Sequence, residues 1–417
     1  MAKLPENLIY TILTRCITLL SSFLVSIFTA HYLGPSGRGD YFFVSAFSTI
    51  LVQFGCLGMH SSSVFLVAKK RAILGGLVGN ALWACIAIGF FATICAIVYN
   101  QFYNKITGIV YIIILTPASL FYLLATNLLV GIKKTHLFNF FQLSSNLSVG
   151  IILLICGLLH LQVNQFLAAT TLVWLIHAVA LFIILFRGCE VALKFNLKLF
   201  KKGFLFGLKS YLASFFSAFI LQGNVIILRH FVTSHELGYY SIAQQISFCL
   251  TSFPAMCALL LFPDLVQDPR NRWTKTKKAL LTMGGPLFFL YLLLMLYGKT
   301  IIPVIFGQQF IHSTLLLQWM LPGSFLLGIT SLLTQYIISD GFPNILVSFW
   351  IIGFITMLTL SSWLIPAHHS QGAAMSFSLA YTIVFLLVTW LAYQKSRKER
   401  LPLVGIQFQK KDQFSVL

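Results

Sequence analysis

The sequence predicts an all-α integral membrane protein with twelve transmembrane helices arranged in two six-helix lobes. Three observations predict this fold: a succession of apolar stretches, an uneven distribution of basic residues around them, and an internal repeat. Hydrophobic residues make up 58% of the 417 residues and charged residues only 9%. So small a charged fraction cannot cover the surface of a soluble protein of this length.

The apolar stretches are about 20 residues long or longer, which is the length that an α-helix needs to cross a bilayer. The first is too long for the core of a signal peptide and precedes no small-residue cleavage site, so we expect it to remain as a helix. The predicted crossings are residues 8–33, 40–67, 77–99, 107–131, 137–160, 164–187, 204–230, 237–262, 279–298, 311–338, 343–364 and 371–394.

The basic residues lie almost entirely in the turns on one side of this map. Of the 28 lysines and arginines, only Arg38, Lys105, Arg229 and Lys299 lie on the opposite side. Cytoplasmic turns carry such an excess, so we expect a multi-pass protein of a bacterial inner membrane with both termini in the cytoplasm. The net charge of +19 is then spread over short juxtamembrane turns, where it meets membrane lipids and not nucleic acid.

Two similar segments divide the chain into halves. Gly39 and Tyr41 in the first correspond to Gly238 and Tyr240 in the second, at an offset of 199 residues, and an apolar stretch follows each pair. Because six predicted crossings separate the two copies, both halves enter the membrane in the same sense. The sequence therefore predicts a parallel pseudo-two-fold repeat, of the kind found in alternating-access transporters.

The predicted domain organisation follows from this repeat. We expect an N-terminal six-helix lobe over residues 1–190 and a C-terminal six-helix lobe over residues 203–394. Lysines alternate with apolar residues in the linker between them, residues 191–202, which is typical of an amphipathic helix on cytoplasmic headgroups. Residues 395–417 are predicted to form a basic cytoplasmic tail.

Five segments, in order along nearly the whole chain, resemble the polysaccharide-export branch of the multidrug/oligosaccharidyl-lipid/polysaccharide (MOP) exporter superfamily. They are residues 33–41, 54–59, 237–243, 303–310 and 371–376. The resemblance is greatest to the Wzx-type flippases of O-antigen and related polysaccharide units. It implies a MATE-like fold that moves a polyprenyl-diphosphate-linked oligosaccharide (an O-antigen, capsule or exopolysaccharide unit) to the outer leaflet by alternating access. Whether a polysaccharide polymerase is a partner of the protein stays open.

Cations within or near the predicted crossings are the first candidates for binding an anionic cargo. Arg15 and Lys209 lie one to two turns inside their crossings, where a cleft between the lobes would bring both to its cytoplasmic mouth. There they would bind a diphosphate, arginine as a bidentate fork and lysine as a point charge. The alternative for both is snorkelling to the headgroups. Arg38 and Arg229 lie near the outer side, where they either receive the emerging diphosphate or are simply solvated.

Three neutral residues are candidates for binding sugar hydroxyls: Asn224, Gln244 and Gln245. The resemblance implies that crossings 1, 2, 7 and 8 line the cavity, and these residues fall in crossings 7 and 8. Hydrogen bonding between helices is the alternative for each amide.

No catalytic constellation and no cofactor motif is visible, so the chain is not predicted to be an enzyme. The eight cysteines form no Cys-x-x-Cys pair, and none is paired with a histidine at metal-ligand spacing. Neither a disulfide nor a metal is therefore expected. Without a phosphate-binding loop, ATP is not expected to drive transport. The driving force stays open: it is a proton gradient, a sodium gradient or the consumption of the product.

Two other functions remain as alternatives. A multidrug cation antiporter of the same fold normally needs a carboxylate within the membrane to exchange ion for substrate. All nine acidic residues lie in predicted turns, tails or crossing ends, which weighs against this alternative. A membrane polysaccharide polymerase or ligase is expected to carry a large soluble loop, and the predicted outer turns are too short to form one.

Overall fold

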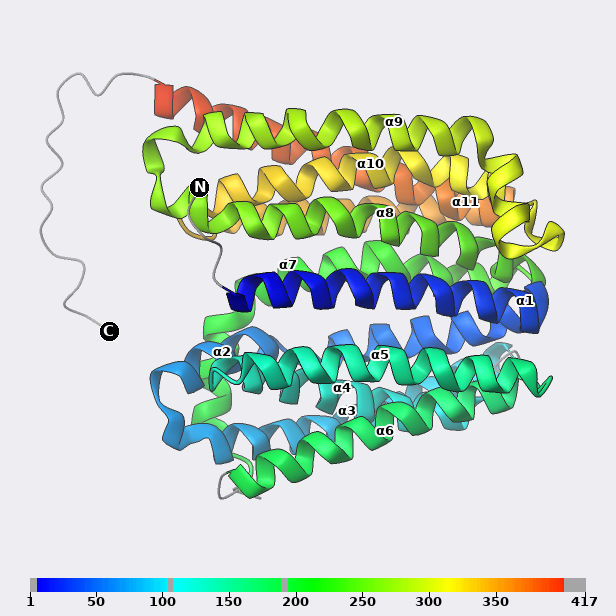
Figure 1. The fold of residues 1–417 in the computed structure, drawn as a ribbon, viewed down its shortest axis with the longest axis horizontal. Coiled ribbons are helices and arrows are strands. Elements are labelled where there is room, and N and C mark those ends of the chain that lie inside the picture. Colours follow the sequence, from blue (N-terminus) through cyan, green and yellow to red (C-terminus); the bar gives the residue numbers. More distant parts are fainter. Residues whose placement is uncertain (1–5, 104–107, 189–193, 401–417) are drawn as a thin grey trace, which may run out of the picture.

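The computed structural model describes residues 6–103, 108–188 and 194–400. These residues form a bundle in which long helices run side by side along one direction (Figure 1). Ten of the described helices are long and apolar enough to cross a membrane. The predicted class, an all-helical multi-pass membrane protein, is confirmed.

The described helices of the first half of the chain are α1 (Glu6–Cys56), α2 (Met59–Lys69), α3 (Leu74–Tyr103), α4 (Ile109–Gly131), α5 (Thr135–Leu158) and α6 (Val163–Gly188). Those of the second half are α7 (Leu197–Phe231), α8 (Ser234–Gln267), α9 (Arg272–Phe306), α10 (Ser313–Ile338) and α11 (Asn344–Arg400). Polar side chains cap two of their starts, because the Asn196 and Thr233 side chains accept hydrogen bonds from the backbone N–H groups of Leu199 and Glu236.

Helix α1 is a hairpin of two arms and not one straight rod. The backbone leaves the helical region at Gly34, with φ 63° and ψ −177°, and Pro35 then starts the second arm. The Arg38 Nη2 donates to Ser26 Oγ at 3.0 Å. In an uninterrupted helix these two residues would lie about 18 Å apart along the axis, so the bond requires the chain to reverse. The turn predicted at this point is therefore a single kink residue between two helical arms.

Helix α11 reverses in the same way at His369, where φ is 49° and ψ is −128°. Ser361 Oγ donates to Ser376 Oγ at 2.9 Å. Along a straight helix their separation would be about 22 Å, so these residues also belong to opposing arms. Gly372 permits the close approach, since a Cβ there would lie 2.1 Å from the carbonyl oxygen of Leu364.

One predicted crossing, residues 40–67, is interrupted in the structure. The second arm of α1 ends at Cys56, and Leu57 and Gly58 both take positive φ before α2 begins. A Cβ at Gly207 of α7 would lie 2.7 Å from the carbonyl oxygen of Gly58. The break thus lies where the first half of the chain contacts α7.

The two ends of the bundle differ in chemistry. We call the end with the kinks at Gly34 and His369 the kink end, on the right in Figure 1. The opposite end, with the start of α9 and the end of α11, is the basic end. At the basic end, Asp340 pairs with Arg272, and with Lys395 at 2.7 Å. These contacts tie the turn after α10 to the start of α9 and the last turns of α11.

The predicted linker falls partly outside the described residues, which omit 189–193. From Leu197 onward the linker sequence is the first part of α7, which continues without a break to Phe231. The lysines of this segment, including Lys198, Lys201 and Lys202, are exposed.

Candidate functional site

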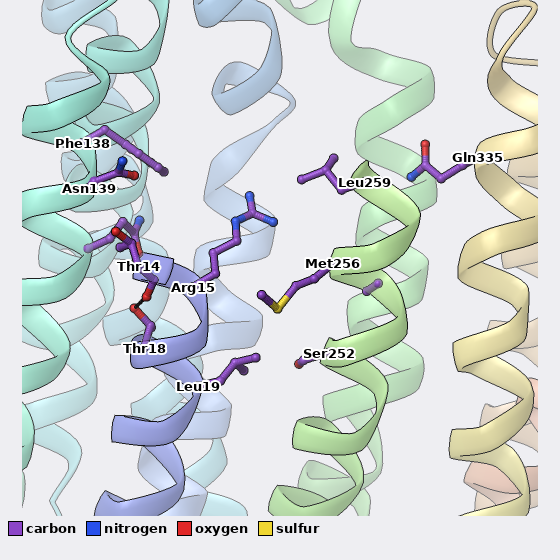
Figure 2. Close-up of a pocket in the computed structure, with 12 residues that line it drawn as sticks. Thr14, Arg15, Thr18, Leu19, Phe138, Asn139, Ser252, Met256, Leu259 and Gln335 are labelled. Atoms are coloured by element: carbon purple, nitrogen blue, oxygen red, sulfur yellow. Dashed lines mark hydrogen bonds between the residues drawn. The ribbon is translucent and has the colours of Figure 1, made fainter. Parts of the chain in front are cut away.

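A cavity of about 430 Å³ opens between α1 and α5 on one side and α8 and α10 on the other. We call it cavity 1. Its only charged lining residue among those described is Arg15, whose side chain extends from α1 into the space facing Met256 and Leu259 of α8 (Figure 2). The cavity is lined by Thr14, Arg15, Thr18, Leu19, Phe138, Asn139, Gln142, Ser252, Ala255, Met256, Leu259 and Gln335. Arg15 is therefore placed to meet an anion that enters between the halves.

A second cavity of about 540 Å³, cavity 2, lies between the two arms of α1, α4, α5, α6, α7 and α8. Gln142 lines both cavities, so cavity 2 adjoins cavity 1. Its polar lining consists of hydroxyl and amide side chains with one arginine: Ser22, Ser26, Arg38, Tyr41, Ser45, Ser48, Thr49, Gln53, Ser119, Tyr122, Gln142, Asn146, Thr170, Gln222 and Gln245. Hydroxyls and amides both donate and accept hydrogen bonds, which suits a ligand that carries many hydroxyl groups.

Aromatic side chains complete the lining of cavity 2. Tyr122 and Trp174 form an edge-to-face pair with ring centroids 4.9 Å apart, and Tyr41 donates to or accepts from Thr170 at 3.1 Å. Flat apolar faces beside hydrogen-bonding groups match the alternating apolar and polar surfaces of a sugar ring.

A row of hydroxyl side chains on the first arm of α1 connects the two cavities. Residues four apart on a helix lie on the same face, one above the other. Thr14 and Thr18 line cavity 1, and Ser22 and Ser26 line cavity 2. We call this row, together with Thr29 at the end nearer Gly34, the hydroxyl stripe. It supplies a continuous polar path from Arg15 toward the kink end.

At that end of the stripe Arg38 is buried in a cage of hydroxyl groups, with only 4% of its surface exposed. Its guanidinium donates to Ser26 at 3.0 Å, to Thr29, and to Ser241 of α8 at 3.2 Å. Burying an arginine in a membrane costs about 2.5–3.5 kcal/mol. Each hydrogen bond to a charged group returns about 1.5–3 kcal/mol, so three of them offset this cost.

Arg229, like Arg38, is predicted to lie near the outer side of the membrane, but the structure gives it a different environment. Its Nη2 forms an ion pair with Asp40 Oδ1 at 2.9 Å, and Ser234 Oγ donates to the same carboxylate oxygen at 2.6 Å. Asp40 is on α1, Arg229 on α7 and Ser234 at the start of α8. The pair therefore joins the two halves of the chain at the kink end.

Close backbone packing accompanies this ion pair. A Cβ at Gly39 would lie 1.8 Å from the carbonyl oxygen of Ser234, and a Cβ at Gly238 would lie 2.0 Å from that of Pro35. We call these four residues, with Asp40 and Arg229, the kink-end contact. Only glycine allows two helix backbones to approach this closely. The kink end is therefore closed between the halves, while cavity 1 lies between them nearer the basic end.

The other predicted site residues take varied positions. Gln245 lines cavity 2. Lys209 is exposed on α7 and lines neither cavity. Gln244 is buried and donates to the carbonyl oxygen of Leu221 at 2.8 Å. Of the seven predicted residues, the structure thus brings Arg38 and Gln245 together in cavity 2 and places Arg15 in cavity 1.

Asn224 is fully buried between α7 and α11. Its Nδ2 donates to the carbonyl oxygen of Ala373 at 3.1 Å, and its Oδ1 accepts from Ser361 at 2.6 Å. It connects α7 to both arms of α11 and does not line either cavity.

The sequence reasoning overlooked the hydroxyl residues that dominate cavity 2. The signal was present as threonine and serine at four-residue intervals along one helix. Such hydroxyls are easily dismissed, because most bond to their own helix backbone, as Thr18 does to the Thr14 carbonyl at 2.8 Å. Within the described ranges, no group of three histidine, cysteine or acidic side chains is arranged to hold a metal ion.

Comparison with solved structures shows which fold this arrangement belongs to. A lipid II flippase, MurJ in an inward closed conformation, matches with a TM-score of 0.74 at 16% identity, over 92% of this chain and 87% of that one. The MATE multidrug transporter DinF-BH matches at 0.65 and 15%, over 94% and 96%. An inward-facing MATE transporter of the MOP superfamily matches at 0.66 and 13%, over 93% and 98%. The chain shares the fold of these three solved structures.

The sequence comparison is more specific. A family model described as "Polysaccharide biosynthesis protein" matches residues 4–268, which is more than half of the chain. The chain belongs to this family. No curated protein matches the sequence.

Proposed function

We propose that this protein is a flippase for polyprenyl-diphosphate-linked oligosaccharides, moving them from the cytoplasmic to the outer leaflet of a bacterial inner membrane. The observation that carries the proposal is the polar path formed by cavity 1, the hydroxyl stripe and cavity 2. An arginine lies at each end of this path, and no carboxylate is among the described lining residues. Such a path suits a cargo with an anionic group and a hydroxyl-rich chain.

The proposed topology follows from charge and from the two hairpins. The basic end faces the cytoplasm, because basic residues gather there. Of the ten helices that are long and apolar enough to cross, α1 and α11 count as two crossings each. The chain then crosses twelve times, and both termini are cytoplasmic. The proposed lobes are residues 1–190 and 203–394, joined by residues 191–202 and followed by the tail 395–417. In the structure α7 already begins within this linker, at Leu197, and α11 extends into this tail, to Arg400. In this orientation the closed kink end faces outward, so the structure represents an inward-facing state.

The kink-end contact supports a pseudo-two-fold relation between the lobes. With the offset of 199 residues, Gly39 is equivalent to Gly238 and Pro35 to Ser234. Gly39 contacts Ser234, and Gly238 contacts Pro35. Reciprocal contacts of this kind are what a two-fold axis through the contact produces. Alternating access then consists of opening this contact while cavity 1 closes at the basic end.

In this mechanism the diphosphate binds first at Arg15, while the polyprenyl tail stays in the lipid. Sugar rings follow the hydroxyl stripe into cavity 2, where Gln53, Gln142, Asn146 and Gln245 exchange hydrogen bonds with their hydroxyls. Arg38 and Arg229 are exposed to the outer side once the kink-end contact opens. The driving force is a proton or sodium gradient or the consumption of the product by a polymerase.

Reconstitution of the full chain in liposomes tests the proposal. A polyprenyl-diphosphate-linked tetrasaccharide is incorporated, and a membrane-impermeant sugar oxidase reports how fast it reaches the opposite leaflet. We expect movement that depends on the protein. Arg15→Gln should slow it about tenfold or more, because a charge-assisted hydrogen bond contributes 1.5–3 kcal/mol.

Lys198→Gln is the matched control, since Lys198 is an exposed cation on α7 outside both cavities, and it should leave the rate unchanged. Lys209→Gln tests the second predicted cation, and a loss equal to that of Arg15→Gln would add Lys209 to the site. Failure of the wild-type protein to move the lipid-linked saccharide, together with transport of a cationic dye, would favour the multidrug antiporter instead.

A further inference from the structure

We propose that Arg38 recognises an acidic sugar of the cargo, at the end of the glycan remote from the diphosphate. This inference rests on the proposed function and specifies the class of saccharide that the site prefers: one with a carboxylate, as in a uronic acid.

The first argument is that Arg38 is a buried cation whose partners are all neutral. Among the described residues that line cavity 2, it is the single charged one. Its hydrogen bonds go to Ser26, Thr29 and Ser241, and in the described ranges no ion pair involves it. Arg229 offers a contrast within the same end of the bundle, because Asp40 neutralises it at 2.9 Å. The positive charge of Arg38 is thus left for a ligand in the cavity.

The second argument is that the guanidinium has donors to spare. Arginine carries five N–H groups in one plane. The cage uses one on each nitrogen: Nε to Ser241, Nη1 to Thr29 and Nη2 to Ser26. One N–H remains on each of the two Nη atoms, and each can donate a charge-assisted hydrogen bond to a carboxylate. The cage therefore holds the guanidinium in place and leaves two of its five N–H groups for a ligand.

The third argument is distance along the path. Arg38, on the second arm of α1, lies beside Ser26 and Thr29 of the first arm. Arg15 is also on the first arm, nearer the start of the helix. At a rise of 1.5 Å per residue, the two arginines are separated by about 17–21 Å of helix. A diphosphate bound at Arg15 cannot reach Arg38, but the sugars attached to it extend toward cavity 2 along the hydroxyl stripe. What meets Arg38 in the loaded protein is therefore the far part of the glycan.

Binding to the purified full chain tests this inference with three probes. Each is a short-chain polyprenyl diphosphate carrying a tetrasaccharide. The first ends in glucuronic acid, the second ends in glucose, and the third has its glucuronic acid next to the diphosphate. We expect the first to bind the wild-type protein about tenfold more tightly than the other two, because a charge-assisted pair forms only with it.

Four variants separate charge recognition from a structural role. Arg38→Gln should make the first probe bind no more tightly than the second, whereas Arg38→Lys should keep part of the preference. Ser241→Ala removes one cage bond but not the charge, and should keep most of it. Arg15→Gln should weaken all three probes equally. Thermal unfolding of each variant shows whether it is folded.

Two results would overturn the inference. One is equal affinity of the wild-type protein for the first and second probes. The other is an Arg38→Gln variant, still folded, that loses affinity for both probes alike, which would make Arg38 a diphosphate ligand or a structural residue. In either case movement of the glucose-ended lipid in liposomes still supports the proposed function. If no probe is bound or moved, the proposed function itself fails.

Discussion

The kink-end contact allows a sharp test of alternating access, by adding one methyl group. In Gly39→Ala the new Cβ would lie 1.8 Å from the Ser234 carbonyl oxygen, and real Cβ contacts are essentially never below 3.0 Å. The α1 and α8 backbones must separate at this point. Because Gly39 does not have positive φ, alanine fits the helix itself and the effect is confined to the contact.

The expected magnitude follows from this clash. Overpacking of a tight contact typically costs 1–3 kcal/mol. Only the closed kink end has the clash, so the equilibrium should shift about 5- to 150-fold toward the state that is open on this side. Ser45 lines cavity 2, so a Ser45→Cys probe reports the opening. In a background without native cysteines, a membrane-impermeant maleimide added outside should label this cysteine faster in Gly39→Ala.

Gly285→Ala is the matched control, because a Cβ at Gly285 meets no atom within 4 Å. Its labelling rate should equal that of the parent protein. If Gly39→Ala, correctly inserted and folded, is labelled at the parent rate too, the helices absorb the methyl group and the kink-end contact does not control access.

Two further predictions concern stability. Burial acts to raise the pKa of Asp340, but the hydrogen bond from Lys395 and the charges of Lys395 and Arg272 outweigh it, so the pKa lies below its ordinary value. A lowered folded pKa stabilises the fold above the unfolded value of about 3.9 and loses this effect as the pH falls through the folded value. Asp340→Asn should thus lower Tm at pH 7. The loss in the free energy of unfolding should be no more than about 1 kcal/mol, because the side chain is 52% exposed. A difference in Tm between the variant and the parent protein that persists in acid would contradict this. Asn224→Ala removes a buried hydrogen-bonding group and should cost about 1–3 kcal/mol without changing the Kd for the cargo, whereas a weakened Kd at unchanged Tm would return Asn224 to the binding site.

Most of the fold was predictable because bilayer-spanning helices are specified locally, by runs of apolar residues of sufficient length. The kinks were harder, because Gly34 and His369 reverse the chain within a single residue where the sequence predicted turns of several. Proline at 35 and glycine at 372 indicated a change of direction, but not how tight it would be. The break at Gly58 lies against the backbone of Gly207, about 150 residues away, and no local pattern reveals this contact.

The site was predictable only in part, for a related reason. Arg15 and Arg38 could be found as cations in an apolar setting, and both line a cavity. The surroundings of Arg38 and Arg229 differ because of partners from other parts of the chain. Asp40 neutralises Arg229, and Ser241 orients Arg38, across about 200 residues of chain. Asn224 shows the reverse case, since a buried amide in a crossing looks the same in sequence whether it binds a ligand or another helix.

The reciprocal packing of Gly39 on Ser234 and of Gly238 on Pro35 makes one chain behave, at this point, like a symmetric dimer. Each side of the contact supplies one glycine and accepts the other, so a change on either side acts on both contacts. Neither glycine can be replaced and compensated by a smaller residue opposite, because the opposing atoms are backbone. Both glycines are therefore constrained together, because each meets the backbone of the opposite half of the chain, and the closest approach between the halves depends on this pair.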